Sequence, residues 1–572
     1  MSNLSDGTPL DSFSRNESIK ATSNHLRGLI KEELVEDTPA FGDDSEQLLK
    51  FHGIYQQDDR DRRKEARAKG LDKHHQLMIR TRIPGGVVSA DAYLAHDDIS
   101  RRWANGTLRV TTRQDFQLHG VLKGDLKRSI AAINESLLTT LGGCGDVERN
   151  IMCCPEPKAD HFHERVHQSI AAMVAALTPR TGAYHEIWLD GEVVDSSEPE
   201  VEPLYGEQYL PRKFKTTVAI EGDNCVDVYA HDLAVVAMRG ADHEVRGFNV
   251  LVGGGLGRTH NKPETFVAVA QPLAFVATDQ IVEVALAVVA VQRDYGNRAN
   301  RKHARLKYTI ADRGLDWFRA EVQNRLTFQL LLPEPLRWEP VDDHLGWHEQ
   351  GDGNLYLGVF IENGRIADTG DVRSRTGLRK IVEELRPQVR LTAQQNVILA
   401  GIDPAQKTRV DELLAEHGIA AVDSIPHAIR YAMACPAIPT CGLAVAEAER
   451  VLPGLIRQIA SVLDELGLAG ERISFRMSGC PNGCSRPYLG DVGLVGTTLG
   501  KYDVMLAGDF EGTRLNRVYA PNVPMGEIPG LLRPLFSKFR LERKLSEGFG
   551  DWVERIGFDA LRAGLVPAEK TA

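Results

Sequence analysis

Two segments that lie far apart in the chain share one pattern of residues. Residues 109–121 (RVTTRQDFQLHGV) align without a gap on residues 390–402 (RLTAQQNVILAGI). The same offset places Cys154 on Cys435 and Pro155 on Pro436. An internal repeat indicates that one structural unit has been duplicated. We therefore predict a duplicated α+β unit, whose second copy carries a cysteine cluster that the first copy mostly lacks.

Length and charge exclude several classes of protein. A chain of 572 residues is too long for one hydrophobic core, so about three or four folding units are expected. The net charge of -11 argues against nucleic acid as a partner, and any anionic ligand must be met by a local basic cluster. No apolar run is long enough to span a membrane, and the polar N-terminus lacks the apolar core of a secretory signal. We expect a cytoplasmic protein.

Local patterns predict several elements. Residues 77–86 read as a strand closed by a Pro-Gly turn, and residues 108–119 as one strand with alternating faces. Residues 213–220 also read as a strand, and residues 443–466 have helical periodicity interrupted by Pro453. Residues 253–257 are glycine-rich, but Arg258 stands where a dinucleotide-binding motif needs its third glycine. We expect no NADPH or flavin site in this chain.

Four of the eight cysteines lie within one short window. They form a C-x5-C pair and a C-x3-C pair on loops rich in proline and glycine, namely Cys435, Cys441, Cys480 and Cys484. These spacings are neither those of zinc ribbons nor those of ferredoxins. Four thiolates on such loops suit a cubane iron-sulfur cluster, and a helix predicted to begin at Cys441 would direct its positive dipole end to the cluster. A closed zinc site is the alternative.

The cysteine motif resembles that of the sirohaem-dependent sulfite and nitrite reductases. The resemblance extends over nearly the whole chain and includes residues 51–60 (FHGIYQQDDR), 210–217 (LPRKFKTT), 251–255 (LVGGG) and 548–552 (GFGDW). Within the family the chain is most similar to the haemoprotein subunits of NADPH-linked bacterial sulfite reductases. The resemblance implies a [4Fe-4S] cluster held by all four cysteines, with Cys484 also bridging the cluster to the iron of a sirohaem.

The resemblance also implies a fold and a set of domains. The expected fold is an α+β, pseudo-twofold duplicated architecture with mixed sheets and three lobes around the cofactor. Residues 1–75 would form an N-terminal arm that could dock a partner. Residues 76–143 and 346–420 would form paired ferredoxin-like half-domains, residues 144–345 a first sirohaem- and substrate-binding domain, and residues 421–572 a second domain with the cluster ligands.

By the same resemblance, four basic residues match those that surround the substrate, namely Arg80, Arg149, Lys213 and Lys215. The two lysines lie two residues apart on a predicted strand, so their side chains would share a face, although a solvent-exposed strand would give the same spacing. Related nitrite reductases tend to have Asn at the second lysine position, so Lys215 favours sulfite. Further residues are expected to contact the macrocycle or its carboxylates, namely Arg113, Gln117, His119 and Asn482.

The resemblance implies an enzyme that reduces sulfite to sulfide for cysteine biosynthesis. Because no site for NADPH or flavin is evident, electrons are expected to come from another protein, either a flavoprotein reductase subunit or a ferredoxin. Two alternatives remain open. The chain could be a ferredoxin-dependent sulfite or nitrite reductase, or a metal-stabilised interaction protein without catalytic activity. The roles of the other cysteines, Cys144, Cys153, Cys154 and Cys225, are left unassigned.

Overall fold

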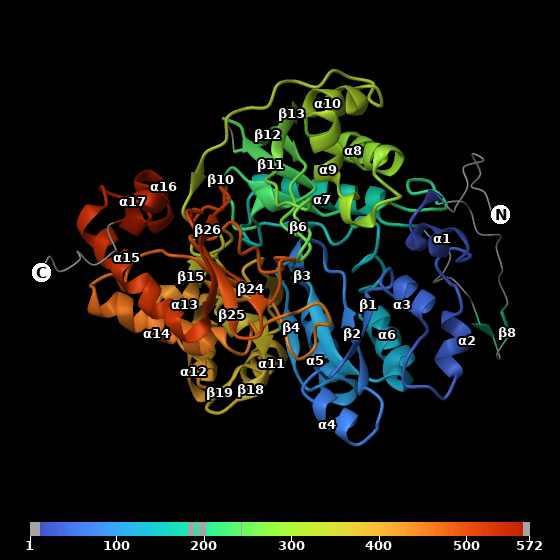
Figure 1. The fold of residues 1–572 in the computed structure, drawn as a ribbon, viewed down its shortest axis with the longest axis horizontal. Helices are drawn as coiled ribbons and strands as arrows, with labels where there is room; N and C mark the ends of the chain where they lie inside the picture. The colour runs from blue at the N-terminus through green and yellow to red at the C-terminus, as the bar shows by residue number, and fades with distance from the viewer. Residues whose placement is uncertain (1–11, 181–187, 190–191, 194–201, 242, 564–572) are drawn as a thin grey trace, which may run out of the picture.

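The computed structural model describes residues 12–180, 188–189, 192–193, 202–241 and 243–563. These residues form three lobes (Figure 1). One lobe contains the two halves of the sequence repeat, a second is built on the strands between the halves, and the third follows the second half. Within the described residues, no helix has both the length and the apolar character needed to cross a membrane.

The first half of the repeat forms a five-stranded sheet with helices α5 (Ala90–Trp103) and α6 (Leu126–Glu135). The strand order is β1 (Ile54–Asp58), β2 (His75–Arg80), β5 (Phe116–Val121), β4 (Leu108–Val110) and β17 (Arg365–Ile366). Strand β1 pairs with β2 along its whole length. Part of the predicted N-terminal arm is therefore an edge strand of this half.

The second half repeats this arrangement with helices α11 (Ser374–Leu385) and α12 (Lys407–Glu416). Its strand order is β15 (Gly346–Glu349), β16 (Leu355–Val359), β21 (Val397–Ile402), β20 (Gln388–Leu391) and β3 (Val87–Val88). The small hairpin β18 (Asp368–Thr369) and β19 (Val372–Arg373) precedes α11.

The two halves exchange one strand each. Strand β3 comes from the first half but pairs with β20, whereas β17 comes from the second half and pairs with β4. Apolar side chains from both halves, among them Phe116 and Leu399, share one core cluster. The predicted duplicated α+β fold is confirmed.

The lobe between the halves, at the top of Figure 1 and called the upper lobe below, contains a mixed sheet. Its strands are β13 (Gln271–Val276), β12 (Val245–Val252), β11 (Leu233–Arg239), β9 (Thr216–Ile220), β10 (Gly222–Asp223), β14 (Trp338–Glu339) and β6 (Met152–Cys153). Helices α7 (His161–Leu177), α8 (Ile281–Tyr295), α9 (Leu306–Arg313) and α10 (Leu315–Gln323) belong to it. The short strands β7 (Trp188–Leu189) and β8 (Glu192–Val193) pair with each other.

The C-terminal lobe, at the left of Figure 1, has the strand order β22 (Ala432–Ala434), β23 (Phe475–Ser478), β24 (Val492–Thr498), β25 (Lys501–Leu506) and β26 (Arg517–Pro524). Its helices are α13 (His427–Arg430), α14 (Leu452–Glu465), α15 (Ile528–Glu542), α16 (Phe549–Ile556) and α17 (Phe558–Ala563). Of the remaining α-helices, α1 (Arg15–Ala21) lies against the lobe between the halves, where Lys20 donates to the Leu210 carbonyl oxygen at 2.8 Å. Helices α2 (Ile30–Val35), α3 (Asp43–Leu49) and α4 (Arg63–Ala68) lie beside the first half.

Three local predictions were wrong in detail. Residues 108–119 form a hairpin of β4 and β5 rather than one strand, with Arg113 in its turn. The strand predicted from residue 213 begins at Thr216, after both lysines. The helix predicted from residue 443 begins at Leu452, with Pro453 in its first turn, because proline lacks an N–H and fits the start of a helix better than its interior.

Candidate active site

The four clustered cysteines follow two neighbouring parallel strands. Strands β22 and β23 run parallel, so their carboxyl ends meet at one edge of the sheet. Cys435 directly follows β22, and Cys480 lies just after β23. Cys441 and Cys484 lie in the loops that continue from these two positions. The fold therefore brings together two cysteine pairs that are widely separated in the sequence.

Hydrogen bonds hold the cysteine loops and direct donors at their sulfurs. The Gly479 amide donates to Cys435 Sγ at 3.3 Å, and Asn482 Nδ2 donates to Cys480 Sγ at 3.4 Å. Arg60 donates to the carbonyl oxygen of Cys441 at 3.0 Å, and Thr112 Oγ1 to that of Cys484 at 2.9 Å. Donors facing sulfur stabilise thiolates, so the loops are built for charged cysteines.

The four clustered thiols need a cation in order to be ionised together. Burial, followed by the nearby Cys484, raises the pKa of Cys435 and Cys441, and raises that of Cys480 to about 11. Four thiolates can therefore coexist here only with a cation to neutralise them. Among the described residues, no three of these sulfurs lie within 4.8 Å of one another. A cluster of several iron atoms, whose ligands stand further apart than those of one zinc ion, is consistent with this spacing.

The helix expected at Cys441 is absent from this part of the described chain. Residues 441–451 form turns, and the amides of Val445 and Ala446 donate to the carbonyl oxygen of Gly479 at 2.9 and 3.0 Å. These bonds fold the segment against the second cysteine loop. A helix dipole therefore does not act on Cys441, and the prediction that it does was wrong.

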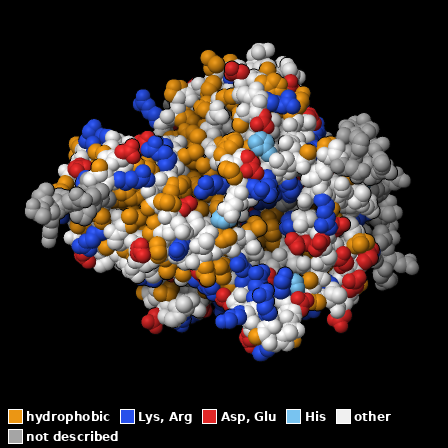
Figure 2. Space-filling model, viewed as in Figure 1, with side chains coloured by type: hydrophobic (Ala, Val, Ile, Leu, Met, Phe, Trp, Pro, Cys, Tyr) orange, Lys and Arg blue, Asp and Glu red, His pale blue; other side chains and the backbone are white. Residues whose placement is uncertain are grey.

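The four predicted anion-binding residues come from two neighbouring regions. An isolated bridge joins Phe214 to Glu148, and the Arg149 amide donates to the Phe214 carbonyl oxygen at 3.2 Å. This bridge lies between Lys213 and Lys215 and brings both lysines close to Arg149. Figure 2 shows Lys and Arg side chains gathered near the middle of the face, where the upper lobe meets the first half of the repeat.

Neither lysine side chain has a hydrogen-bond or ion-pair partner among the described residues. Burial, together with the Arg212 and Arg149 charges, holds the pKa of Lys213 well below its usual value. Burial and the adjacent Lys213 do the same to Lys215. Cations without counter-ions are costly to remove from water even in part, so these half-buried lysines suit an anion that would pair with them.

Arg80 has neighbours among both the basic residues and the clustered cysteines. Its Nη1 donates to Cys144 Sγ at 2.8 Å, and its guanidinium lies 6.0 Å from the centre of the Tyr55 ring. With its amide oxygen turned toward Arg80, Gln117 accepts from Nη2 at 2.5 Å. Burial lowers the pKa of Arg80, but the charges of Cys144, Tyr55 and Cys484 outweigh it and raise the pKa overall. Of the four clustered cysteines, Cys484 thus lies close enough to Arg80 to interact with its charge.

The remaining predicted residues lie at the same junction but not on one strand face. Gln117 and His119 share a face of β5, whereas Arg113 reaches the site from the hairpin turn. Arg113 donates to the Asn150 carbonyl oxygen and lies 3.3 Å from His231 Nδ1, while its Nε has no partner. His119 Nδ1 is also buried without a partner among the described residues. Such unsatisfied groups fit a polycarboxylate macrocycle.

Other residues at the site were missed by the sequence reasoning. Tyr55 and Cys144 face Arg80, and His231 orients Arg113. Asp115 is buried next to Arg80 and Arg113, and burial raises its pKa to about 7. Only Tyr55 lay within a segment that carried the family resemblance; the rest gave no signal because they are far apart in the sequence.

Family comparisons agree with this arrangement. A model described as "Nitrite/Sulfite reductase ferredoxin-like half domain" matches residues 69–136 and 348–417, which are the two halves of the repeat. A model described as "Nitrite and sulphite reductase 4Fe-4S domain" matches residues 171–330. The four clustered cysteines lie outside that range, in the C-terminal lobe.

The chain has relatives over nearly its whole length. It is 45% identical to "Sulfite reductase [NADPH] hemoprotein beta-component" of Staphylococcus haemolyticus, over 95% of this chain and 94% of that protein. It is also 45% identical to "Sulfite reductase [ferredoxin]" of Synechococcus elongatus, over 96% and 90% respectively. The solved structure of Mycobacterium tuberculosis NirA has the same fold, with a TM-score of 0.77 and 24% identity over 98% of this chain and 99% of that chain. This chain belongs to the nitrite and sulfite reductase family.

Proposed function

We propose that the chain is the haemoprotein subunit of an assimilatory sulfite reductase, which reduces sulfite to sulfide with six electrons. The observation that carries this proposal is a pair of half-buried lysines, Lys213 and Lys215, whose side chains have no counter-ion among the described residues and which lie close to Arg149, with Lys213 also close to Cys484. The names of the full-length relatives support it.

The residues present suit both prosthetic groups. The four cysteines of the C-terminal lobe would hold a [4Fe-4S] cluster, and Arg113, Gln117, His119 and Asn482 would contact a sirohaem. When bound, this pair of groups supplies the iron that ligates sulfite and the electrons that reduce it. Cys484 is exposed, whereas Cys435 and Cys480 are buried, which supports the proposal that the Cys484 thiolate would contact the sirohaem as well as the cluster.

The protein residues bind the anion and supply protons. Arg80 and Arg149 stay protonated, and their guanidinium groups can hold sulfite oxygens through paired hydrogen bonds. Lys213 and Lys215 have lowered pKa values, so each can release a proton to an oxygen that leaves as water. Three oxygens must leave in this way before sulfide is formed.

Substrate and donor follow from finer features. Lys215 stands where related nitrite reductases tend to have Asn, and this favours sulfite over nitrite. The electron donor would be a flavoprotein reductase subunit or a ferredoxin, since relatives named for both NADPH and ferredoxin are equally similar. The segment 1–75 is a candidate docking region, although residues 1–11 lie outside the described part of the chain.

A direct test is to produce the chain in a host that makes sirohaem and to measure its absorption spectrum, iron and acid-labile sulfide. We expect a coloured protein with about five iron atoms and about four sulfides per chain. It should oxidise reduced methyl viologen when sulfite is added, and more slowly with nitrite. A colourless protein, or one that prefers nitrite, would contradict the proposal. Cys484→Ser should uncouple the two centres, whereas Cys153→Ser should not.

A further inference from the structure

A second group of metal-binding side chains lies away from the cysteine site described above. Cys154, Asp223, Cys225 and His344 each offer a ligand atom, and these atoms all lie within 4.8 Å of one another. Cys154 follows β6, Asp223 ends β10, Cys225 is two residues further on, and His344 precedes β15. Both cysteines and His344 are buried. In the part of the chain that the structure describes, no other group meets this distance criterion.

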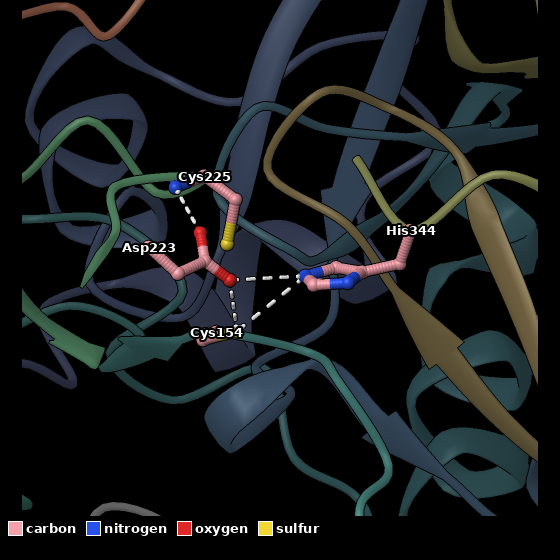
Figure 3. Close-up of side chains that lie close together, drawn as sticks. All are labelled: Cys154, Asp223, Cys225 and His344. Carbon is pink, nitrogen blue, oxygen red and sulfur yellow. Dashed lines mark hydrogen bonds and ion pairs between the residues drawn. The ribbon is translucent and has the colours of Figure 1, made fainter. Parts of the chain in front are cut away.

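The contacts within the group are close and directed inward. Cys154 Sγ lies 2.9 Å from Asp223 Oδ2 and 3.6 Å from His344 Nε2, and these last two atoms are 3.1 Å apart. The Cys225 amide donates to Asp223 Oδ1 at 2.7 Å, which turns Oδ2 toward the histidine and the thiol. Figure 3 shows the carboxylate of Asp223 facing His344, with the Cys225 side chain pointing toward the same space.

The ligand types match those of zinc, and so does the spacing of Cys154 and His344. Zinc prefers four ligands drawn from thiolate, imidazole and carboxylate. Around one tetrahedral zinc ion, sulfur and nitrogen ligands are about 3.5 Å apart, close to the spacing of Cys154 Sγ and His344 Nε2. The other ring nitrogen, Nδ1, lies 4.0 Å from Glu156 Oε1, so a carboxylate is close enough to orient the ring.

We propose that Cys154, Asp223, Cys225 and His344 bind one zinc ion in a closed structural site. Binding displaces the protons of the two thiols, and no electron transfer is involved. All four protein ligands are present, so no coordination position is open to a substrate. The site goes beyond the proposed reductase activity and does not depend on it.

The sequence repeat supports this site independently. Cys154 is the counterpart of Cys435, a predicted cluster ligand, and the structure preserves the equivalence. Gln114 Nε2 donates to the Cys153 carbonyl oxygen at 2.7 Å, and its counterpart Gln395 donates to the Ala434 carbonyl oxygen at 3.1 Å. Both cysteines thus occupy the same place after equivalent strands. We infer that both copies bind metal here, one as a cluster and the other as a single ion.

The proposed ion would join parts of the chain that are distant in sequence. His344 belongs to the connection between β14 and β15, which leads from the upper lobe into the second half of the repeat. The other three ligands belong to the upper lobe. A zinc ion would therefore fasten this connection to the upper lobe.

The test is elemental analysis of the purified holoprotein after gel filtration in the presence of EDTA. We expect about one zinc per chain in addition to the iron. X-ray absorption at the zinc edge should show two sulfur neighbours at about 2.3 Å and nitrogen or oxygen neighbours at about 2.0 Å. Absence of zinc, or zinc without sulfur neighbours, would overturn the proposal even if every variant failed to fold.

Variants test whether the zinc ion is bound by these four side chains. Cys225→Ala and His344→Gln should each lower the zinc content at least about tenfold and leave iron, acid-labile sulfide and the visible spectrum unchanged. Cys153→Ala is the matched control, because Cys153 is an adjacent buried thiol outside the group, and it should keep its zinc. Zinc retained in the first two variants, or a Cys154–Cys225 disulfide found by mass spectrometry, would refute the site. If the purified wild-type protein contained no iron, the proposed reductase function would be contradicted, but the zinc site would not.

Discussion

Two lysine side chains at the site lack the acidic partner that lysines removed from water usually have. Lys213 and Lys215 lie beside Arg149 and have no acidic partner among the described residues. Buried lysines are usually paired, because an isolated charge in a protein interior is costly. An anion that paired with these half-buried lysines would stabilise the protein. The unpaired lysines are therefore evidence for an anion site that the net charge of the chain would not suggest.

Replacing Lys215 by Asn tests its role in choosing the substrate. We expect kcat/KM for sulfite to fall by about a hundredfold, because one proton donor and one positive charge are lost. Turnover of nitrite should fall much less. Steady-state rates with reduced methyl viologen measure both substrates in one preparation. Lys302→Asn, which alters an exposed lysine, should change neither rate. An equal loss for both substrates would show that Lys215 does not discriminate.

At the scale of residues, the sequence predicted the clustered cysteines well but predicted the position of Arg113 poorly. The four clustered cysteines were found because their spacing on proline- and glycine-rich loops is unusual. Arg113 was placed on a strand because residues 108–119 alternate in polarity, yet it lies in a turn. That turn has no glycine. Gln114 takes the left-handed conformation there, with φ of 56°, and its side chain bonds to the Cys153 and Leu391 carbonyl oxygens. These partners are distant in sequence, so local patterns could not show the turn.

At the scale of elements, the repeat carried more information than the local patterns. Gln395, the counterpart of Gln114, has φ of 72° in an equivalent hairpin turn. The exchange of β3 and β17 between the halves could not be predicted, because each is only two residues long. Strands this short show no alternation. The sequence thus predicted the duplication but not the way in which the two copies are joined.

Asp491 links three elements of the C-terminal lobe. Its carboxyl group accepts hydrogen bonds from the Ser474 amide and hydroxyl at 2.9 and 2.7 Å, and from the Gly550 amide at 3.0 Å. It thereby connects the residues before β23 and β24 to helix α16. Burial raises its pKa from 3.8 to about 6. The folded protein therefore keeps this proton at pH values where the unfolded chain has lost it.

This pKa shift predicts a pH dependence of stability. Because the pKa is higher in the folded state, the stabilisation is complete below about pH 4 and is lost as the pH rises to about 6. The shift corresponds to about 3 kcal/mol of unfolding free energy. We expect the melting temperature of wild type, relative to Asp491→Asn, to decrease between these pH values and to stay level above them. Parallel melting curves for the two proteins across this range would contradict the assignment.

At the scale of the whole molecule, one carboxylate joins three parts of the chain. Glu449 of the C-terminal lobe pairs with Arg109 on β4 of the first half and with Arg365 on β17 of the second half, the latter at 2.6 Å. The two arginines face each other across the exchanged strand pair. The Glu449 amide also donates to the Cys435 carbonyl oxygen at 3.1 Å. The side chain of Glu449 thus holds the strand exchange, and its backbone amide holds the cysteine loop.

Replacing Glu449 by Gln should disturb the junction of the lobes directly, and the cysteine loop indirectly, because the loop is bonded to the backbone of the same residue. The change leaves two largely buried guanidinium groups without a counter-charge, which we expect to cost about 3–5 kcal/mol of folding stability. Thermal unfolding of the holoprotein should begin at a lower temperature, and the visible absorbance of the cluster should bleach together with it. Glu362→Gln is the matched control, since Glu362 pairs with Arg457 at the surface, and it should cost at most about 1 kcal/mol. If both variants melted like wild type, the lobes would have to be held together mainly by apolar packing rather than by this shared carboxylate.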